Sequence, residues 1–241
     1  MTALPFWATA FIDVAAPDHD AAVAFWRGVT GYGLSAPRPD GDGGAFATLL
    51  PPEGDDYLRV QRLARGGSRV HYDLSVTDRR AAADRAVGLG ATEVADHGHV
   101  VLRSPAGLLF CFVQQPGAAV PPPASWPGGR SRVDQVCVDV GPSLFDAELA
   151  FWAALTGFAP TPARGEFRRL DGDGMPLRLL FQRLDDDRPA GFHLDLAADD
   201  PEAEVARHVA LGATVEGPGR GWTVLVDPAG LRYCVTSRAP G

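Results

Sequence analysis

Residues 24–34 read AFWRGVTGYGL and residues 150–161 read AFWAALTGFAPT, so one stretch occurs twice, about half a chain apart. In each copy a Phe-Trp pair is followed by Thr-Gly and then by an aromatic residue. Three further stretches match in the same order: VHYDL with FHLDL, LGAT with LGAT, and SPAGLLFCF with DPAGLRYCV. Repetition at this spacing indicates that one fold unit is encoded twice.

The repeat divides the 241 residues into two halves, and each half is long enough to bury a core of its own. We predict a first domain over residues 1–114 and a second domain over residues 133–241. Residues 115–132 between them are so rich in Pro and Gly that they cannot continue a helix or a central strand. We therefore interpret this segment as a linker.

Hydrophobic periodicity and turn residues predict the order β-α-β-β-β twice in each half. The fold class is therefore α+β. In the first half we expect helices that follow Asp18 and Asp78, and strands at 6–14, 45–50, 57–63, 69–76, 92–94, 99–103 and 108–114. In the second half we expect helices that follow Ser143 and Asp200, and strands at 133–140, 167–170, 177–184, 191–196, 222–226 and 231–236. The residue before each helix is a predicted N-cap.

Composition narrows the classes of partner. A formal net charge of −8 argues against a nucleic-acid binder and against a binder of anionic membranes. Three cysteines without a CxxC pair indicate free thiols in a reducing compartment. The apolar N-terminus has no Lys or Arg before Asp13 and is too short to span a membrane, so we expect a cytoplasmic protein.

Taken together, the repeated motifs resemble those of the vicinal oxygen chelate superfamily, which includes glyoxalases, bleomycin-resistance proteins and extradiol dioxygenases. The similar features are the Phe-Trp helix that ends in Gly-aromatic, a strand that begins with His, the LGA helix end and the D-P-x-G turn before the last strand. The resemblance covers nearly the whole chain outside the linker. It implies two tandem glyoxalase-like domains, each of paired β-α-β-β-β modules whose sheet curves into a cup.

Alternation along the strands predicts which side chains line each cup, because residues two apart share a face. In VHYDLSV the polar face carries His71 and Asp73, and in FHLDLA it carries His193 and Asp195. The same parity brings further polar side chains to the cups, which we expect to bind a ligand: Tyr57, Arg59, Gln61, Cys111, Arg178, Gln182, Arg232 and Cys234. Trp222 is expected at a cup rim, whereas the helical spacing of Trp26 and Trp152 favours core packing.

Metal-dependent relatives hold one divalent ion through the first, fourth, fifth and eighth strands, as the resemblance implies, typically with His or Gln, Glu, His and Glu. Only the fifth-strand histidine matches that set in each half. The other positions hold residues that suit a hard divalent ion poorly: Phe11, Gln61 and Cys111 in the first half, and Cys137, Gln182 and Cys234 in the second. We therefore expect no resident metal cofactor. The alternative is zinc on Cys137, His193 and Cys234, or another divalent metal.

The residues also allow acid–base chemistry without a metal. Asp13, His71 and Asp73 can converge in the first cup, and in the second the corresponding residues are Asp139, His193 and Asp195. A carboxylate beside an imidazole suits general acid–base work. The structural alternative is that the strand aspartates pair with donors such as Arg59 or Arg232.

Three functions follow from these patterns. The first is a protein that binds a small organic molecule without a catalytic metal, in sequestration, resistance or an accessory metabolic role. The second is a lyase, isomerase or cyclase that uses the His–Asp pairs or a zinc ion. The third is a pairing protein with vestigial cups. The sequence leaves open whether the chain is a monomer of paired domains or a homodimer.

Overall fold

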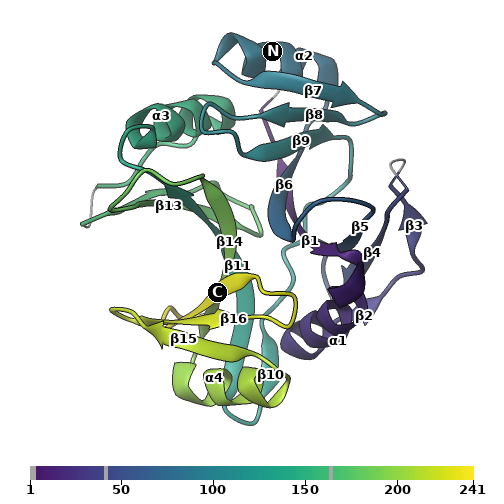
Figure 1. Ribbon diagram of the computed structural model, residues 1–241, viewed down its shortest axis with the longest axis vertical. Helices are drawn as coiled ribbons and strands as arrows, with labels where there is room; N and C mark the ends of the chain where they lie inside the picture. The colour runs from purple at the N-terminus through teal and green to yellow at the C-terminus, as the bar shows by residue number, and fades with distance from the viewer. Residues whose placement is uncertain (1–3, 41–42, 163–164) are drawn as a thin grey trace. The chain divides into compact units, whose positions relative to one another are not determined.

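A computed structural model describes residues 4–40, 43–162 and 165–241. The first half builds one mixed sheet in the order β2-β4-β5-β1-β6-β9-β8-β7, with β3 paired to β4 (Figure 1). The elements of this half are β1 (Trp7–Ala15), α1 (His19–Thr30), β2 (Gly33–Leu34), β3 (Arg38–Pro39), β4 (Ala45–Leu50), β5 (Leu58–Leu63), β6 (Arg69–Ser75), α2 (Arg79–Gly88), β7 (Thr92–Asp96), β8 (Val100–Arg103) and β9 (Leu109–Val113).

The second half repeats this plan in a sheet with the order β12-β13-β11-β14-β17-β16-β15, and β10 pairs with β11. Its elements are β10 (Ala124–Trp126), β11 (Gly129–Val140), α3 (Phe145–Thr156), β12 (Phe167–Leu170), β13 (Arg178–Arg183), β14 (Gly191–Ala198), α4 (Pro201–Ala210), β15 (Thr214–Pro218), β16 (Trp222–Val226) and β17 (Arg232–Thr236). Two open sheets with few helices confirm the predicted α+β class.

Contacts divide the chain into two compact units, and each unit takes one β-α-β module from each half. Unit 1 comprises the N-terminal segment up to Ala10, His71–Ala119 and Val136–Phe192. Unit 2 comprises Phe11–Val70, Val120–Gln135 and His193–Gly241. The predicted boundaries at 114 and 133 describe the sequence repeat, and as domain boundaries they stay a prediction.

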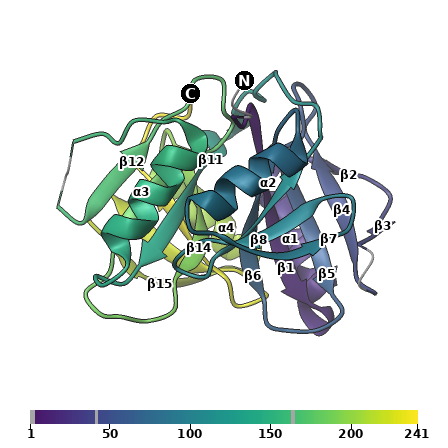
Figure 2. The same ribbon diagram turned by 90° about the horizontal axis from the view of Figure 1, so that it is seen from above.

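The core of unit 1 forms where α3 brings its Phe-Trp pair onto aromatic side chains of β6 and β9. The Trp152 ring lies edge-on to Phe110, with centroids 5.1 Å apart, and to Tyr72, with centroids 6.1 Å apart. Arg85 of α2, a helix that packs on β7, β8 and β9 (Figure 2), donates to the carbonyls of Ala154 and Leu155 in the last turn of α3. A positive side chain there satisfies carbonyls that have no partner inside the helix.

Unit 2 uses the same contacts between the matched elements. The Trp26 ring of α1 lies 5.3 Å from that of Tyr233 on β17. Arg207 of α4 donates to the carbonyls of Gly28 and Val29 at 2.7 and 2.8 Å, and its guanidinium stacks on Trp126, 3.7 Å from the ring centroid. These contacts confirm that the repeated Trp residues are core residues.

Two of the four predicted N-caps are confirmed. The side chains of Asp78 and Asp200 accept from the backbone N–H groups of Ala81 and Ala203, both at 3.0 Å. Asp18 is wrong as a side-chain cap, because a 3-10 turn precedes α1 and holds Asp18 in the right-handed helical region. Ser143 is also wrong, because the chain turns once more and α3 starts after Leu144.

The largest difference in secondary structure lies within the predicted linker. Trp126 pairs with Gly129, so Pro127 and Gly128 form the turn of a β10–β11 hairpin, and β11 begins four residues before the expected position. Gly129 has φ +125°, and a Cβ there would meet Asp199 at 3.0 Å. The Pro and Gly residues that predicted a linker therefore include a strand connection.

Candidate functional site

The first candidate cluster, called the His71 cluster, consists of His71, Asp73 and Cys111 in unit 1. His71 and Asp73 share the polar face of β6, and parallel pairing sets Asp73 opposite Cys111 of β9. The ligand atoms of the three side chains all lie within 4.8 Å of one another. The alternation of the strands thus brings together the three residues that the sequence predicted on this face.

Burial keeps the Cys111 thiol of the His71 cluster neutral. His71 Nε2 lies 3.5 Å from Asp73 Oδ1, and the Asp73 side chain is only 5% exposed. That oxygen makes no well-formed hydrogen bond within the described residues. Burial, helped by the Asp73 charge and opposed by His71, raises the pKa of the Cys111 thiol to about 12, so the thiol is neutral near pH 7.

The second candidate cluster, called the His193 cluster, has the same composition in unit 2: His193, Asp195 and Cys234. His193 Nε2 lies 3.2 Å from Asp195 Oδ1 and 3.7 Å from Cys234 Sγ. Parallel pairing of β14 with β17 sets Asp195 opposite Cys234. Burial and the Asp195 charge raise the pKa of Cys234, and His193 opposes that shift.

The two clusters differ in one hydrogen-bond partner. Gln135 Nε2 donates to Asp195 Oδ2, so one oxygen of that carboxylate is held by the protein. The matched position in the first half is Thr9, whose hydroxyl makes no hydrogen bond within the described residues. The sequence analysis missed Gln135, although the repeat aligns it with Thr9 two residues before the position of the first-strand metal ligand.

The first-strand aspartates have partners of their own. Asp13 is fully buried and forms a 3.0 Å ion pair with Arg69 of unit 2. In unit 1, Asp139 lies two residues from Cys137, whose Sγ is 3.8 Å from Asp139 Oδ1. A catalytic role for either aspartate stays a prediction. The alternative zinc set of Cys137, His193 and Cys234 draws on both units and also stays a prediction.

The polar face of β5 carries two of the predicted ligand-binding residues, both already in contact with acids. Arg59 is 5% exposed, and its guanidinium contacts Asp56 at 3.3 Å. Gln61 donates to Asp40 Oδ2 at 2.9 Å. Arg59 thus contacts a loop aspartate, and its pairing with a strand aspartate stays a prediction.

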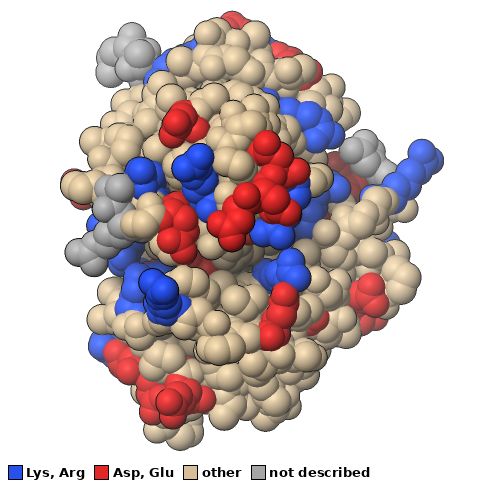
Figure 3. Space-filling view, turned by 60° about the vertical axis from the view of Figure 1, so that its left-hand side comes forward, with Lys and Arg blue, Asp and Glu red and all other residues tan. Residues whose placement is uncertain are grey.

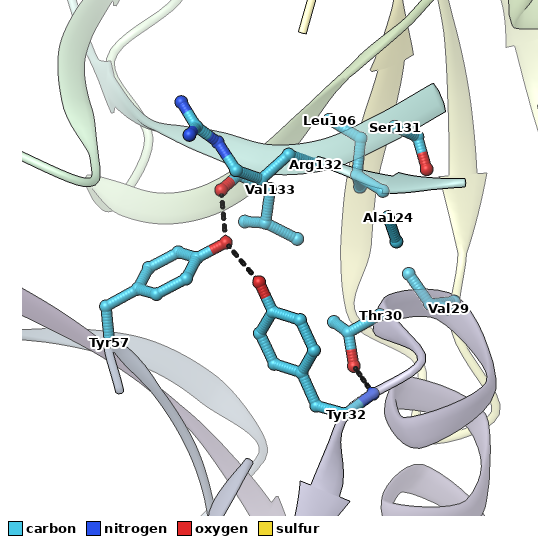
Figure 4. A pocket seen from close by; sticks show the side chains of 9 residues that line it. All are labelled: Val29, Thr30, Tyr32, Tyr57, Ala124, Ser131, Arg132, Val133 and Leu196. Carbon is cyan, nitrogen blue, oxygen red and sulfur yellow. Dashed lines mark hydrogen bonds between the residues drawn. The ribbon is translucent and has the colours of Figure 1, made fainter. Parts of the chain in front are cut away.

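Tyr57 precedes β5 and is buried in unit 2. Its hydroxyl donates to the carbonyl of Val133 at 2.8 Å and lies 3.4 Å from the hydroxyl of Tyr32 (Figure 4). Burial raises the pKa of both phenols, so both stay neutral. The two rings border a small pocket that also touches Val29, Ser131 and Leu196.

The other predicted binding residues lie on strands of the second half. Gln182 and Arg178 lie on β13, where Gln182 pairs with Phe167. Arg232 forms a two-bond ion pair with Glu216, with both distances 2.6 Å. Trp222 is the first residue of β16 and is half-buried. Their role in binding stays a prediction.

One face of the molecule shows no concentration of basic side chains. On the face drawn in Figure 3, acidic and basic side chains lie intermixed, and most of that face is uncharged. No helix among the described residues combines the length and the apolar character that crossing a membrane requires.

Comparison with known proteins agrees with this architecture. The family model for a glyoxalase-like domain matches residues 9–113 and 135–236. The chain belongs to the glyoxalase-like domain family. This confirms the resemblance to the vicinal oxygen chelate superfamily that the repeated motifs indicated. No curated protein sequence matches the chain.

Solved structures share the fold of this glyoxalase-like protein at low identity. The Mn(II)-bound glyoxalase from Novosphingobium aromaticivorans has a TM-score of 0.62 at 20% identity, over 98% of this chain and 81% of that one. An extradiol ring-cleaving dioxygenase from B. fuscum has a TM-score of 0.67 at 12% identity, over 99% and 73%. A xylose isomerase-like TIM barrel/4-hydroxyphenylpyruvate dioxygenase fusion protein has a TM-score of 0.63 at 14% identity, and the chain spans 49% of it.

The residues at the family's metal positions do not fit a hard ion such as Mn(II). Phe11 offers no ligand atom and packs edge-on against Phe46, with centroids 5.6 Å apart. The Gln61 amide is held by Asp40, and Cys111 supplies a neutral thiol at the position where the resemblance implies a carboxylate. Hard divalent ions prefer carboxylate and carbonyl oxygens. What the His71 cluster offers is a nitrogen, an oxygen and a sulfur, the three kinds of ligand that zinc accepts.

Proposed function

We propose that this glyoxalase-like protein binds a small organic molecule at the His71 cluster and at the His193 cluster, without a resident hard divalent ion. It would act in the cytoplasm, in sequestration, in resistance of the bleomycin type, or as an accessory protein of small-molecule metabolism. The observation that carries the proposal is the pair of buried His–Asp contacts, one in each unit, on strand faces that the sequence repeat places in equivalent positions.

The buried carboxylate is the part of each cluster best suited to hold a ligand. Asp73 Oδ1 and Asp195 Oδ1 are both buried without a well-formed hydrogen bond within the described residues. A buried acceptor that lacks a donor costs free energy, about 1–3 kcal/mol for a polar group and more for a charged one. A hydroxyl or amide of a ligand would supply that donor, and the adjacent imidazole offers a second hydrogen-bonding group.

Two measurements test the proposal. Elemental analysis of the purified protein is expected to give far less than one Mn, Fe or Zn per chain. Isothermal titration with homoprotocatechuate, the compound named for a dioxygenase of the same fold, is expected to give saturable binding that His71→Ala weakens about tenfold or more. His97→Ala is the matched control, because His97 is exposed in a turn and is expected to leave the affinity unchanged. One divalent ion per chain would overturn the metal-free part of the proposal.

Acid–base catalysis is the second candidate, and the 3.2 Å contact between His193 and Asp195 favours it. A carboxylate beside an imidazole favours the protonated imidazole, which suits the transfer of a carbon-bound proton in an isomerase or lyase. The chain contains no lysine, so imine chemistry through a lysine amine is excluded. Exchange of ligand C–H protons with D₂O, followed by NMR and lost in His193→Asn, would favour this candidate over simple binding.

A further inference from the structure

The side-chain amide of Gln135 fills a place in unit 2 that is filled differently in unit 1. β11 and β14 are neighbouring strands, and Gln135 Nε2 of β11 donates to Asp195 Oδ2 of β14. The two residues are buried, at 1% and 3% exposed. Their contact shows that a primary amide fits against the buried carboxylate of the His193 cluster.

The matched place in unit 1 is lined by two short hydroxyl side chains. In the sequence repeat Thr9 of β1 takes the position of Gln135, and Ser75 of β6 takes the position of Ala197. β1 and β6 are also neighbouring strands, and both hydroxyl residues are 1% exposed. A threonine is shorter than a glutamine and carries no amide, so Thr9 cannot repeat the contact that Gln135 makes.

Unit 1 therefore has more buried polar atoms without a partner at this place than unit 2 has. Within the described residues Thr9 Oγ1, Asp73 Oδ1 and Ser75 Oγ form no hydrogen bond. Asp73 and Ser75 are two residues apart, so they share a face of β6. At the matched positions of unit 2, the described residues leave only Asp195 Oδ1 in this state. Because buried polar groups almost always have a partner, the three atoms mark a place for one.

The three unpaired atoms together complement an amide. An ionised carboxylate such as that of Asp73 can only accept, whereas the hydroxyls of Thr9 and Ser75 can each donate. A primary amide meets both needs, because its N–H groups donate to the carboxylate and its carbonyl oxygen accepts from a hydroxyl. A ketone of the same shape would leave Asp73 Oδ1 unpaired, and a carboxylate would be repelled by it.

An apolar surface beside the His71 cluster suits the body of such a ligand. Strand pairing sets Asp73 beside Cys111 of β9, and Cys111 opposite Val101 of β8, so the three share one face. Leu109 is two residues from Cys111 and lies on the same face. Val101 and Leu109 are half-buried, and the His71 side chain is 13% exposed. Solvent therefore reaches this face at an imidazole and at two apolar side chains, next to the buried carboxylate.

We propose that the His71 cluster binds a small molecule through a primary carboxamide, which takes the place beside Asp73 that the Gln135 amide takes beside Asp195. The amide N–H donates to Asp73 Oδ1, the amide carbonyl accepts from Thr9, and the apolar body lies on the half-buried side chains of β8 and β9. This assignment rests on the proposed function, because it gives the chemical class of the ligand. It also makes the His71 cluster the tighter site, since a ligand at the His193 cluster meets a carboxylate that an amide of the protein already holds.

The test uses two neutral probes of nearly equal shape, benzamide and acetophenone, which differ only in that a methyl group replaces the amide nitrogen. Each probe is titrated into the full chain and followed by protein-observed NMR. Wild type is expected to bind benzamide about tenfold or more tightly than acetophenone, because only the amide supplies a donor to Asp73 Oδ1.

Reciprocal substitutions move the internal amide between the two units. Thr9→Gln gives unit 1 the glutamine of unit 2, and it is expected to remove the preference for benzamide. Gln135→Thr takes that glutamine away from the His193 cluster, and it is expected to add a second benzamide site of similar affinity. Thr92→Gln is the matched control, because it makes the same change at an exposed residue of the edge strand β7, and it is expected to keep the preference.

The outcomes separate the carboxamide assignment from the function it rests on. Equal affinities for the two probes in wild type would overturn the assignment while the binding function stands, and so would binding of homoprotocatechuate without binding of benzamide. A preference that survives in Thr9→Gln would overturn the placement at the His71 cluster. If Thr9→Gln does not fold, failure of Gln135→Thr to add a site overturns that placement instead. Absence of binding by both probes and by homoprotocatechuate would overturn the proposed function itself.

Discussion

Unit 1 and unit 2 bury the same tryptophan in the same place but supply its hydrogen-bond partner from different elements. In unit 2, Trp26 Nε1 donates to Asp227 of the turn before β17, at 2.9 Å. In unit 1 the matched turn residue is Ser104, and Trp152 Nε1 donates instead to Glu148 of its own helix, at 2.7 Å. Each carboxylate also accepts from a backbone N–H of the turn, from Ala229 or Ala106.

The difference shows that the fold requires a carboxylate at one point in space, and that the chain can supply it from either of two positions. Where the turn has Asp227, the position on α1 that matches Glu148 is Ala22, which is fully buried. A buried indole N–H and the free N–H groups of a tight turn need an acceptor, because each one left unpaired costs about 1–3 kcal/mol. Unit 2 has Asp227 in the turn and Ala22 on the helix, whereas unit 1 has Ser104 in the turn and Glu148 on the helix. Either combination supplies one carboxylate that keeps those donors paired.

The largest effect is expected from Asp227→Ala. The change removes hydrogen bonds to Trp26 Nε1 and to the backbone N–H groups of Ala229 and Leu231. Because all three donors are left without this buried acceptor, we expect the free energy of unfolding to fall by about 4 kcal/mol, measured by urea denaturation.

A double variant tests whether the carboxylate can be moved from the turn to the helix in unit 2. The double variant Ala22→Glu with Asp227→Ser copies the arrangement of unit 1 into unit 2, and it is expected to recover at least half of the loss. Ala22→Glu alone is expected to destabilise, because it adds a second buried carboxylate beside Asp227, whose pKa burial already raises. If the double variant is no more stable than Asp227→Ser, the two positions are not interchangeable and the comparison fails.

The next largest loss of stability is expected at the arginines that donate to the last carbonyls of α1 and α3. Arg207 caps α1, stacks on Trp126 and contacts Glu204 at 2.7 Å, whereas the described contacts of Arg85 in unit 1 are only the carbonyls of α3. We expect Arg207→Ala to cost about 3 kcal/mol and Arg85→Ala about 1 kcal/mol in urea denaturation. Equal losses would mean that the stacking and the ion pair add nothing to the cap.

Some features of the fold could be predicted from the sequence alone, and others could not. The order of elements and the residues on each strand face were predictable, because periodicity and the repeat are local signals, and the His71 cluster followed from them. The caps at Asp78 and Asp200 were predictable for the same reason. The β10–β11 hairpin was not, since its Pro-Gly turn has the composition of a linker. The strand β15 was also missed, although the repeat matches it to the expected strand 92–94.

The hydrogen-bond partners in the site could not be read from the sequence. Gln135 reaches Asp195 from a strand 60 residues away, and Arg69 reaches Asp13 across neighbouring strands. Alternation predicts that a side chain lies on a face, but the partner it contacts depends on the register and length of the neighbouring side chains. The ion pair of Arg232 with Glu216 on β15 is one such contact that alternation alone did not predict.

Two buried glutamates, one in each unit, are expected to respond to pH with opposite sign. Burial raises the pKa of Glu148, and the hydrogen bonds from Ser104, Trp152 and Ala106 only partly offset that rise. For Glu204 burial also acts upward, but Arg207, His208 and Ser131 outweigh it and lower the pKa to about 2. A raised carboxyl pKa in the fold adds stability as pH falls, whereas a lowered one loses stability as pH falls.

We therefore expect the loss of stability caused by Glu204→Gln to be greatest at pH 7 and to shrink by about 2 kcal/mol as the pH approaches 3. The loss caused by Glu148→Gln is expected to be smallest at pH 7 and to grow toward pH 4. Urea denaturation of both variants and of wild type at pH 7, 5.5, 4 and 3 gives the two slopes. Slopes of the same sign would show that the two units handle their buried charge alike.

The smallest effect concerns a polar network that unit 2 has and unit 1 lacks. His208 Nδ1 lies 3.1 Å from the Tyr233 hydroxyl, and the matched residues of unit 1 are Ala86 and Phe110, both fully buried. Tyr233→Phe is expected to cost about 1 kcal/mol, because it leaves a buried imidazole nitrogen without that partner. In a His208→Ala background the same change is expected to cost nothing, since the pair then matches unit 1. A cost that stays the same in both backgrounds would mean that the hydroxyl is held by another group, because a double-mutant cycle isolates the coupling of the two side chains.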